Sequence, residues 1–220
     1  MYTLINAGPS PYGRKVSVAL YEKGLPFRTI FDLPWAEAVE TRQHSPLEQL
    51  PILIPSVGDP IYDSCFIIDW LEWTHPECPL LPTALEQRIV ARQLQVLGER
   101  LMEIAQSIIF ESQRAAPAAA LLERQSRKIV GGLQAAEAMF AQGIARLEGE
   151  RPHIGEIAVA TTLLCWEFVI EQGISPPLDI LDWRGRHPEL KKRIGELSCR
   201  ESFRQSEPRP MPINVAGVVH

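Results

Sequence analysis

Cysteine is scarce in this sequence. Only four of the 220 residues are cysteines, at Cys65, Cys78, Cys165 and Cys199; none belongs to a C-x-x-C pair and none has a histidine at zinc-finger spacing. We therefore expect no metal site and interpret the cysteines as reduced and mostly structural. Only their positions at the two ends of one predicted helix leave a reactive role open for Cys65 and Cys78.

Long apolar runs and an excess of positive charge are also missing. The longest apolar runs, such as Ile157 to Cys165, fall short of the about 20 residues that a membrane span needs. Residues Met1 to Ala7 lack the basic flank of a signal peptide. The 22 basic residues are outnumbered by 27 acidic ones and form no basic stripe. We therefore expect a cytoplasmic protein that binds neither nucleic acid nor a membrane.

The first 80 residues contain patterns of both strands and helices. Strand patterns are short apolar runs bounded by Gly, Pro or Asp, and helix patterns repeat apolar residues every three or four positions. The predicted elements are a strand at Tyr2–Ala7, a helix at Ser10–Gly24, strands at Phe27–Leu33, Pro51–Ile54 and Pro60–Tyr62, and a helix at Ser64–Thr74. A parallel pair followed by an antiparallel hairpin and a helix predicts a mixed sheet of the thioredoxin type.

After residue 85 the strand pattern stops and only helical spacing remains. The predicted helices are a long amphipathic one through Val90–Ile108, one at Leu121–Phe140 weakened by Gly131-Gly132, a buried central one at Ile154–Ile170, and one at Leu190–Leu197. The stretch Thr74–Thr83 contains three prolines and separates the two patterns. We therefore predict a thioredoxin-like domain over 1–80, an all-helical domain over 85–205, and a tail over 206–220. The tail is either disordered or folded back over a neighbouring surface.

Ser10 lies between the first predicted strand and the first predicted helix. A serine here serves as an N-cap, and its hydroxyl can also donate a hydrogen bond to a thiolate, which the helix dipole favours at this end. Gly13 lets a ligand approach closely. Arg14 and Lys15 in the same turn are either solvated side chains or a source of positive potential for an anionic ligand.

Two dipeptides occur where a thioredoxin-like sheet exposes its ligand edge. Leu50-Pro51 opens a strand, and a cis bond there would turn the Leu50 N–H and C=O outward to pair with an extended peptide. Asp63-Ser64 begins a helix. The two residues act either as plain caps or together as a site for an amino-acid head group, with Ser64 for the carboxylate and Asp63 for the ammonium.

These motifs, in this order and spacing, resemble the glutathione transferase family, and in particular its bacterial serine-type members. The segments that carry the resemblance are Ser10–Val16, Glu22–Phe27, Ser45–Leu53, Ile61–Ser64, Pro79–Pro82, Pro152–Ala158 and Arg200–Phe203. The resemblance covers about residues 1 to 208 and is carried mainly by the first 80. It implies a dimeric, detoxifying glutathione S-transferase with glutathione as substrate and no metal.

The resemblance also implies roles for individual residues. Ser10 would hydrogen-bond the glutathione sulfur, Leu50 would pair with the cysteinyl unit beside a cis Pro51, and Asp63 with Ser64 would hold the γ-glutamyl group. A small electrophilic, apolar substrate would bind against the helical half. The full set of implied site residues, with Gln49 as a polar contact and Tyr12 and Arg14 as further candidates, is Ser10, Tyr12, Arg14, Gln49, Leu50, Pro51, Asp63 and Ser64.

Three positions depart from the family pattern. Glu48 stands where glycine is usual and adds a negative charge near an anionic ligand. His153 stands where Ser or Thr normally caps a helix, and Glu156 where Asp is usual. Because a glutamate at this position still fits one half of a capping box, we expect a folded but less well capped helix.

Two other functions fit the same sequence. A thiol-dependent reductase or peroxidase of this fold wants a cysteine at the position of Ser10, and no cysteine precedes Cys65. A non-catalytic binding or regulatory protein would keep the fold without turnover, and Glu48 and the altered cap favour this alternative.

Overall fold

Four short strands pair into one mixed sheet in the first part of the chain. The computed structural model describes residues 1–33, 40–145, 151–173 and 183–211. The strands β1 (Tyr2–Asn6), β2 (Phe27–Phe31), β3 (Ile52–Ile54) and β4 (Ile61–Tyr62) lie in the order β2-β1-β3-β4. The β1–β2 pair is parallel and the other two pairs are antiparallel. This arrangement confirms the predicted fold class, a thioredoxin-like sheet followed by helices.

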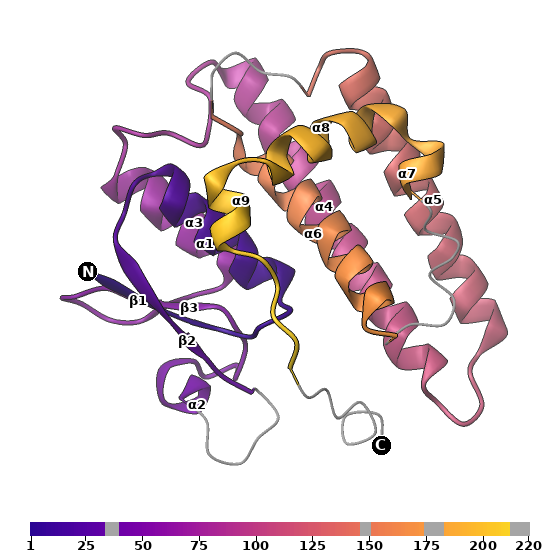
Figure 1. Ribbon diagram of the computed structural model, residues 1–220, viewed down its shortest axis with the longest axis horizontal. Coiled ribbons are helices and arrows are strands. Elements are labelled where there is room, and N and C mark those ends of the chain that lie inside the picture. Colours follow the sequence, from indigo (N-terminus) through magenta and orange to yellow (C-terminus); the bar gives the residue numbers. More distant parts are fainter. Residues whose placement is uncertain (34–39, 146–150, 174–182, 212–220) are drawn as a thin grey trace.

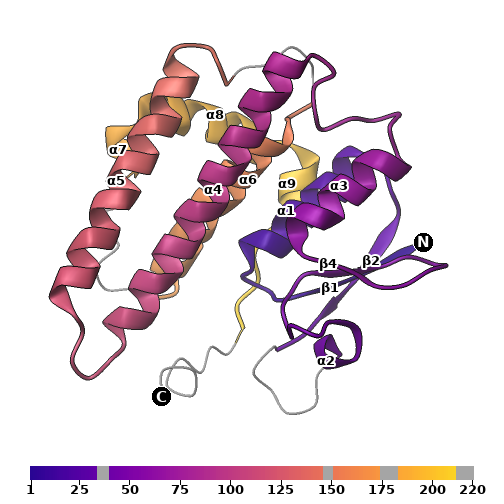
Figure 2. The same ribbon diagram turned by 180° about the vertical axis from the view of Figure 1, so that it is seen from behind.

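Helices cover both faces of the sheet. Helices α1 (Pro11–Glu22) and α3 (Ser64–Thr74) pack together on the face toward the long helices, and the short α2 (Thr41–His44) lies on the other face (Figures 1 and 2). Leu4 and Ile5 are neighbours on β1 and point to opposite faces of the sheet. Both are completely buried because helices cover both faces.

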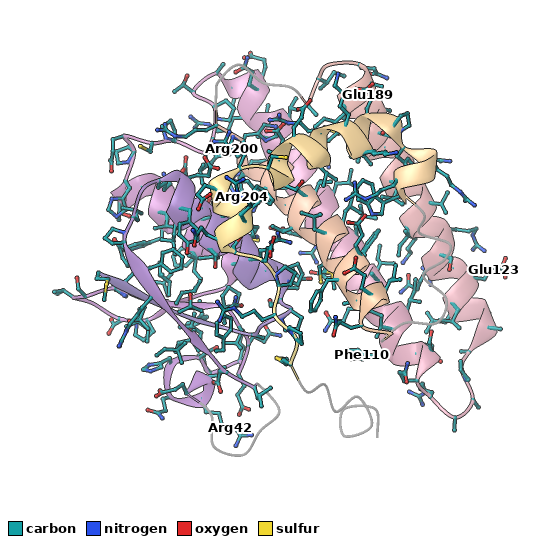
Figure 3. All side chains as sticks on the ribbon, in the orientation of Figure 1. Arg42, Phe110, Glu123, Glu189, Arg200 and Arg204 are labelled. Carbon is teal, nitrogen blue, oxygen red and sulfur yellow. The ribbon has the colours of Figure 1, made fainter. Side chains whose placement is uncertain are left out.

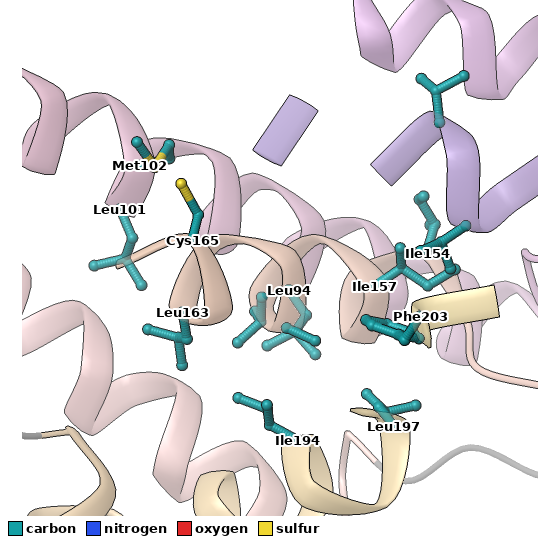
Figure 4. Packing of buried hydrophobic residues seen from close by; sticks show 14 of the residues in the cluster. Leu94, Leu101, Met102, Ile154, Ile157, Leu163, Cys165, Ile194, Leu197 and Phe203 are labelled. Carbon is teal, nitrogen blue, oxygen red and sulfur yellow. The ribbon is translucent and has the colours of Figure 1, made fainter. Parts of the chain in front are cut away.

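A bundle of helices forms the second part of the chain. It contains α4 (Leu85–Ser112), α5 (Ala119–Ala141), α6 (Ile154–Glu171), α7 (Trp183–Arg186), α8 (Pro188–Ser198) and α9 (Glu201–Gln205). Side chains of α4, α8 and α9 surround α6, which confirms the prediction that this apolar helix is the buried centre (Figure 4). The α4 and α6 backbones approach closely at Gly98, where a Cβ would lie 2.7 Å from the Val159 nitrogen. The predicted domain limits stay a prediction.

Helix α5 runs without a break through Gly131 and Gly132, so the two glycines that were predicted to weaken it do not interrupt it. A Cβ at Gly132 would lie 2.7 Å from a methyl group of Leu101. The missing side chain therefore lets α5 pack closely on α4, and tertiary packing outweighs the low helix propensity of glycine.

The N-terminus of α6 carries a complete capping box. His153 Nδ1 accepts from the Gly155 N–H at 3.1 Å, and Glu156 accepts from the His153 N–H at 3.1 Å. His153 Nε2 donates to the Ala145 carbonyl at 2.9 Å, which fixes the tautomer. Burial lowers the pKa of His153, which favours the neutral form that this geometry needs. The expectation of a poorly capped helix is therefore wrong.

Charged groups join α1 to the helical part. Arg14 donates to the Phe203 carbonyl at 3.2 Å, and Arg200, which lies where the chain crosses from α8 to α9, pairs with Glu22 at 2.7 Å (Figure 3). Lys15 forms an ion pair with Glu99 on α4. Arg14 and Lys15 are both buried, so their interpretation as solvated side chains is wrong.

Among the described residues no helix is both long and apolar enough to cross a membrane. The same residues contain no cluster of three or more His, Cys, Asp or Glu side chains placed to hold a metal ion.

Candidate functional site

A cavity of about 600 Å³ lies between the sheet and the helical bundle. The loops that follow β1 and β4 and the loop that precedes β3 form one wall, and α4 and α6 form the other. Every predicted site residue except Arg14 lines this cavity. They are Ser10, Tyr12, Gln49, Leu50, Pro51, Asp63 and Ser64.

Ser10 is the N-cap of α1 and faces the cavity. Its Oγ accepts a hydrogen bond from the Gly13 N–H at 3.2 Å, which leaves the hydroxyl proton to be donated. None of the described residues accepts that proton. Ser10 therefore combines a free donor with the positive end of a helix dipole.

The Leu50–Pro51 peptide bond is cis in the structure. Leu50 lines the cavity, and among the described residues neither its N–H nor its C=O has a hydrogen-bond partner. Gln49 beside it is exposed and lines the same cavity. This segment therefore presents an unpaired backbone donor and acceptor to the cavity.

Asp63 and Ser64 lie at the start of α3. Asp63 has a φ of 66° and a ψ of 126°, a backbone conformation that residues with a side chain rarely adopt. Its Oδ1 accepts from the N–H groups of Cys65 at 2.8 Å and Phe66 at 3.2 Å, and nothing in the described ranges bonds its Oδ2. Ser64 is buried, and its hydroxyl has no partner within those ranges. The pair thus offers an acidic oxygen and a hydroxyl side by side.

Glu48 adopts a φ of 51°, the left-handed region where glycine is favoured. Its carboxylate pairs with Arg42 at 3.0 Å, and both side chains are about half exposed. The residue lines the cavity, so its charge lies near the predicted ligand but is partly matched by Arg42.

The structure does not bring Arg14 to this cavity. Its side chain is buried beneath α9, with the guanidinium 5.7 Å from the centre of the Phe203 ring. It borders a separate, smaller hollow of about 100 Å³. Tyr12, the other further candidate, does face the cavity, and burial and the charge of Glu103 raise its pKa, which keeps the phenol neutral.

A network of Lys15, Glu99 and Cys65, of which Cys65 and Glu99 line the cavity, was not predicted. Cys65 Sγ donates to Glu99 Oε2 at 3.0 Å, and Lys15 pairs with the same carboxylate. Burial and Glu99 raise the pKa of the Cys65 thiol to about 12, against the opposing effect of Lys15. The three residues lie on three different helices, so no local sequence pattern indicates that they are close together.

The helical wall of the cavity is mostly apolar. Its apolar members are Met102, Ile109, Phe110, Cys165 and Val169, with Arg100, Glu103 and Gln106 as polar members. Cys165 donates to the Pro9 carbonyl at 3.3 Å, and burial raises its pKa to about 12, so it stays a thiol. Met211 also lines the cavity, a contribution from the tail that the sequence pattern does not indicate.

Comparison with known proteins gives a consistent set of relatives. A family model described as the glutathione S-transferase N-terminal domain matches residues 4–79. A glutathione S-transferase from Methylobacterium radiotolerans, solved in complex with glutathione sulfonate, is 39% identical, with 97% of each chain covered and a TM-score of 0.82. A glutathione transferase family member from Pseudomonas fluorescens Pf-5, solved with bound glutathione, is 28% identical over 96% of this chain and 100% of that one, with a TM-score of 0.75. The uncharacterized GST-like protein YibF of Escherichia coli K12 is 28% identical over 93% of this chain and 98% of its own length.

Proposed function

This chain belongs to the glutathione S-transferase family, and on that premise we propose that it binds glutathione and joins it through the sulfur to a small, apolar electrophile. One observation carries the proposal. Ser10, the cis Leu50–Pro51 pair and the Asp63–Ser64 pair come from three separate stretches of sequence and line one cavity. Their free groups match, in kind, the thiol, the peptide and the amino-acid head group of glutathione.

The thiol would be ionised beside Ser10. Lowering a cysteinyl pKa from about 8.5 to about 6.5 requires roughly 2.7 kcal/mol. The dipole at a helix N-terminus supplies about 0.3–1 kcal/mol, and a hydrogen bond to a charged partner supplies about 1.5–3 kcal/mol. The dipole alone is too weak, whereas the dipole and the Ser10 hydroxyl together are sufficient.

The rest of glutathione would be held by backbone and charge. The cysteinyl unit pairs with the Leu50 N–H and C=O in the manner of an added strand. The γ-glutamyl carboxylate accepts from Ser64, and the ammonium faces Asp63, whose Oδ2 is unbonded among the described residues. These contacts fix the sulfur next to Ser10, which is the main contribution of such a site to rate.

In the reaction itself the thiolate attacks the electrophilic carbon. A carbon–sulfur bond forms with the sulfur electron pair, and the leaving group departs with the electrons of the bond that breaks. The hydroxyl of Ser10 stabilises the sulfur charge before the attack, and the apolar wall of α4 and α6 holds the electrophile. No redox partner is needed.

The cysteines weigh against the reductase alternative. Cys65 is the first cysteine in the chain, and its raised pKa of about 12 keeps it protonated and weakly nucleophilic. A non-catalytic protein with this site would bind glutathione without converting it, so a measurement of turnover separates it from a transferase.

Calorimetry with glutathione, followed by a conjugation assay with 1-chloro-2,4-dinitrobenzene, tests the proposal. Binding with turnover supports a transferase. Binding without turnover across a panel of electrophiles would favour a binding or regulatory role. Loss of conjugation activity in Cys65→Ser but not in Ser10→Ala would favour thiol chemistry at Cys65. Absence of glutathione binding would overturn both the transferase and the reductase.

We also propose that two copies of the chain associate through α3 and α4. Phe66 and Trp73 on α3 are 48% and 68% exposed and stack edge to face, and Leu85 and Ile89 on α4 are similarly exposed. Phe66 also borders a shallow hollow of about 540 Å³ beside β4. Exposed aromatic and aliphatic side chains, one of them beside a hollow, are typical of a protein interface, and a second copy can offer the same surface in return.

A further inference from the structure

The described part of the tail, residues 206–211, is here called the terminal strap. It leaves α9, crosses the loop between β1 and α1, and ends at the cavity (Figure 1). The sequence left open whether this segment folds back on the protein. In the structure it does so as far as Met211, the last described residue.

Three contacts anchor the strap. Ser206 donates its hydroxyl to the Ser202 carbonyl at 2.7 Å, which continues the end of α9. The Arg209 N–H donates to the Gly8 carbonyl at 3.0 Å, and the Arg209 guanidinium lies 4.8 Å from the centre of the Phe31 ring. The strap is therefore bound to the same loop that carries Ser10.

The Gly8 contact is too close for any side chain. A Cβ at Gly8 would lie 2.6 Å from the Arg209 carbonyl oxygen, which is shorter than real Cβ contacts. Met211 follows Arg209 by two residues, which span at most about 7 Å. The side chain of Met211 is consequently held near the mouth of the cavity on the Ser10 side, and it lines that cavity.

We propose that the terminal strap is a specificity-determining wall of the cavity, in which Met211 contacts the apolar group attached to the glutathione sulfur and Arg209 is a positioning residue. This inference rests on the proposed function and extends it. The groups assigned above to the peptide and the γ-glutamyl part of glutathione, at Leu50, Asp63 and Ser64, belong to other segments, whereas the strap contacts the loop that carries Ser10, the residue assigned to the sulfur. The strap therefore acts on the substituent of the sulfur and not on the tripeptide.

The chemistry of Met211 fits this role. An unbranched thioether is polarizable and adapts to apolar partners of different shape. Met102 and Phe110 line the same cavity from α4. An alkyl or aryl group on the sulfur would thus meet a soft apolar surface made from α4 and the terminal strap.

Calorimetry on the full chain with glutathione, S-methylglutathione and S-hexylglutathione measures how the affinity depends on the group attached to the sulfur, which tests the proposed role of the strap. Met211→Ala should weaken binding of S-hexylglutathione about three- to tenfold because a buried apolar contact is lost, and should leave glutathione within about twofold. Arg209→Ala removes the side-chain contact with Phe31 but keeps the backbone hydrogen bond to Gly8, so it should give a smaller loss of the same kind, and the double variant should add little further loss. Met211→Leu should retain the affinity for S-hexylglutathione.

A matched control separates the strap from general effects of charge. Arg204 on α9 is exposed and pairs with Glu201, and Arg204→Ala should change neither affinity. Unchanged affinity for S-hexylglutathione in Met211→Ala, or an equal loss of affinity for glutathione and for its S-hexyl derivative, would refute the proposed role of the strap. Failure of the unaltered protein to bind glutathione would instead refute the proposed function, so the two failures are distinguishable.

Discussion

Lys15 on α1 and Glu99 on α4 form a buried ion pair across the junction between the sheet and the helical bundle. The two side chains are 1% and 8% exposed. Burial by itself would raise the pKa of Glu99, but the Lys15 charge and hydrogen bonds from Lys15, Cys65 and Gln95 lower it overall. The carboxylate is therefore ionised and fully partnered, and the pair fixes α1, which carries Ser10, against α4.

Removal of one partner should be costly. We expect Lys15→Met to lower the free energy of unfolding by about 3–5 kcal/mol, because it leaves the Glu99 charge buried without a counter-ion. Urea unfolding measures this change. The double variant Lys15→Met/Glu99→Leu should recover most of the loss, and a double variant as unstable as the single one would contradict the account.

Replacing Ser10 should change the ionisation of bound glutathione. Ser10→Ala removes one hydrogen bond to a charged sulfur, worth about 1.5–3 kcal/mol, and should raise the apparent thiol pKa by about one to two units. The pH–rate profile of conjugation and the ultraviolet absorbance of the thiolate both measure this shift. Tyr12→Phe serves as the control, and a profile that moves with Tyr12 but not with Ser10 would transfer the role to the tyrosine.

The His153 cap should make stability depend on pH. Because burial lowers the folded-state pKa of His153 below its ordinary value of 6.5, the unfolded chain binds the proton more readily. This contribution to stability is complete above the unfolded pKa and is lost as the pH falls toward the folded pKa. Denaturant unfolding as a function of pH should show the loss, and His153→Ser, which keeps a side-chain cap but cannot titrate, should reduce it.

Glu48 should oppose both stability and glutathione binding. Glu48→Gly relieves a left-handed conformation that costs about 1–2 kcal/mol in a residue with a Cβ and loses an exposed ion pair worth about 0–1 kcal/mol, so thermal unfolding should show equal or higher stability. Glutathione affinity should rise because a negative charge is removed. Glu48→Gln keeps the backbone conformation and removes only the charge, so it should raise affinity alone. Weaker binding in both variants would show that the carboxylate assists the ligand.

Association through α3 and α4 should depend on aromatic side chains. Light scattering coupled to size-exclusion chromatography should give twice the 24.7 kDa mass of the chain for the unaltered protein. Phe66→Ser with Trp73→Ser should give the single mass, because an apolar interface loses its largest exposed members. The exposed pair Arg127 and Glu123 on α5 offers a neutral control through Arg127→Ala. A monomeric unaltered protein would rule the interface out.

The parts of the fold that the sequence predicts are those with local causes. Ser10-Pro11 and Asp63 cap their helices by hydrogen bonds to residues two or three positions away, so the starts of α1 and α3 are readable from the chain itself. The mixed sheet follows from short apolar runs and turn residues in order. Helices α7 and α9 escape prediction because four and five residues hold too little periodicity.

The candidate site likewise contains residues that the sequence predicts and residues that it does not. Residues next to strand ends and caps, such as Leu50 and Ser64, are predictable because the fold class fixes where those ends lie. Arg14 has the same local signal, yet its long side chain turns to the Phe203 carbonyl, which is distant in sequence. The partnership of Lys15 with Glu99 and the arrival of Met211 at the cavity likewise depend on packing between remote segments, and nothing local encodes them.

The hydrogen bond between Gly8 and Arg209 has a consequence for the order of assembly. The loop around Ser10 is synthesised well before Phe203 and Arg209, which lie far along the chain from it. A nascent chain with its sheet already paired thus still lacks the groups that hold that loop from behind. The loop is therefore held from both sides only after residues 203–209 have been added and have packed against it.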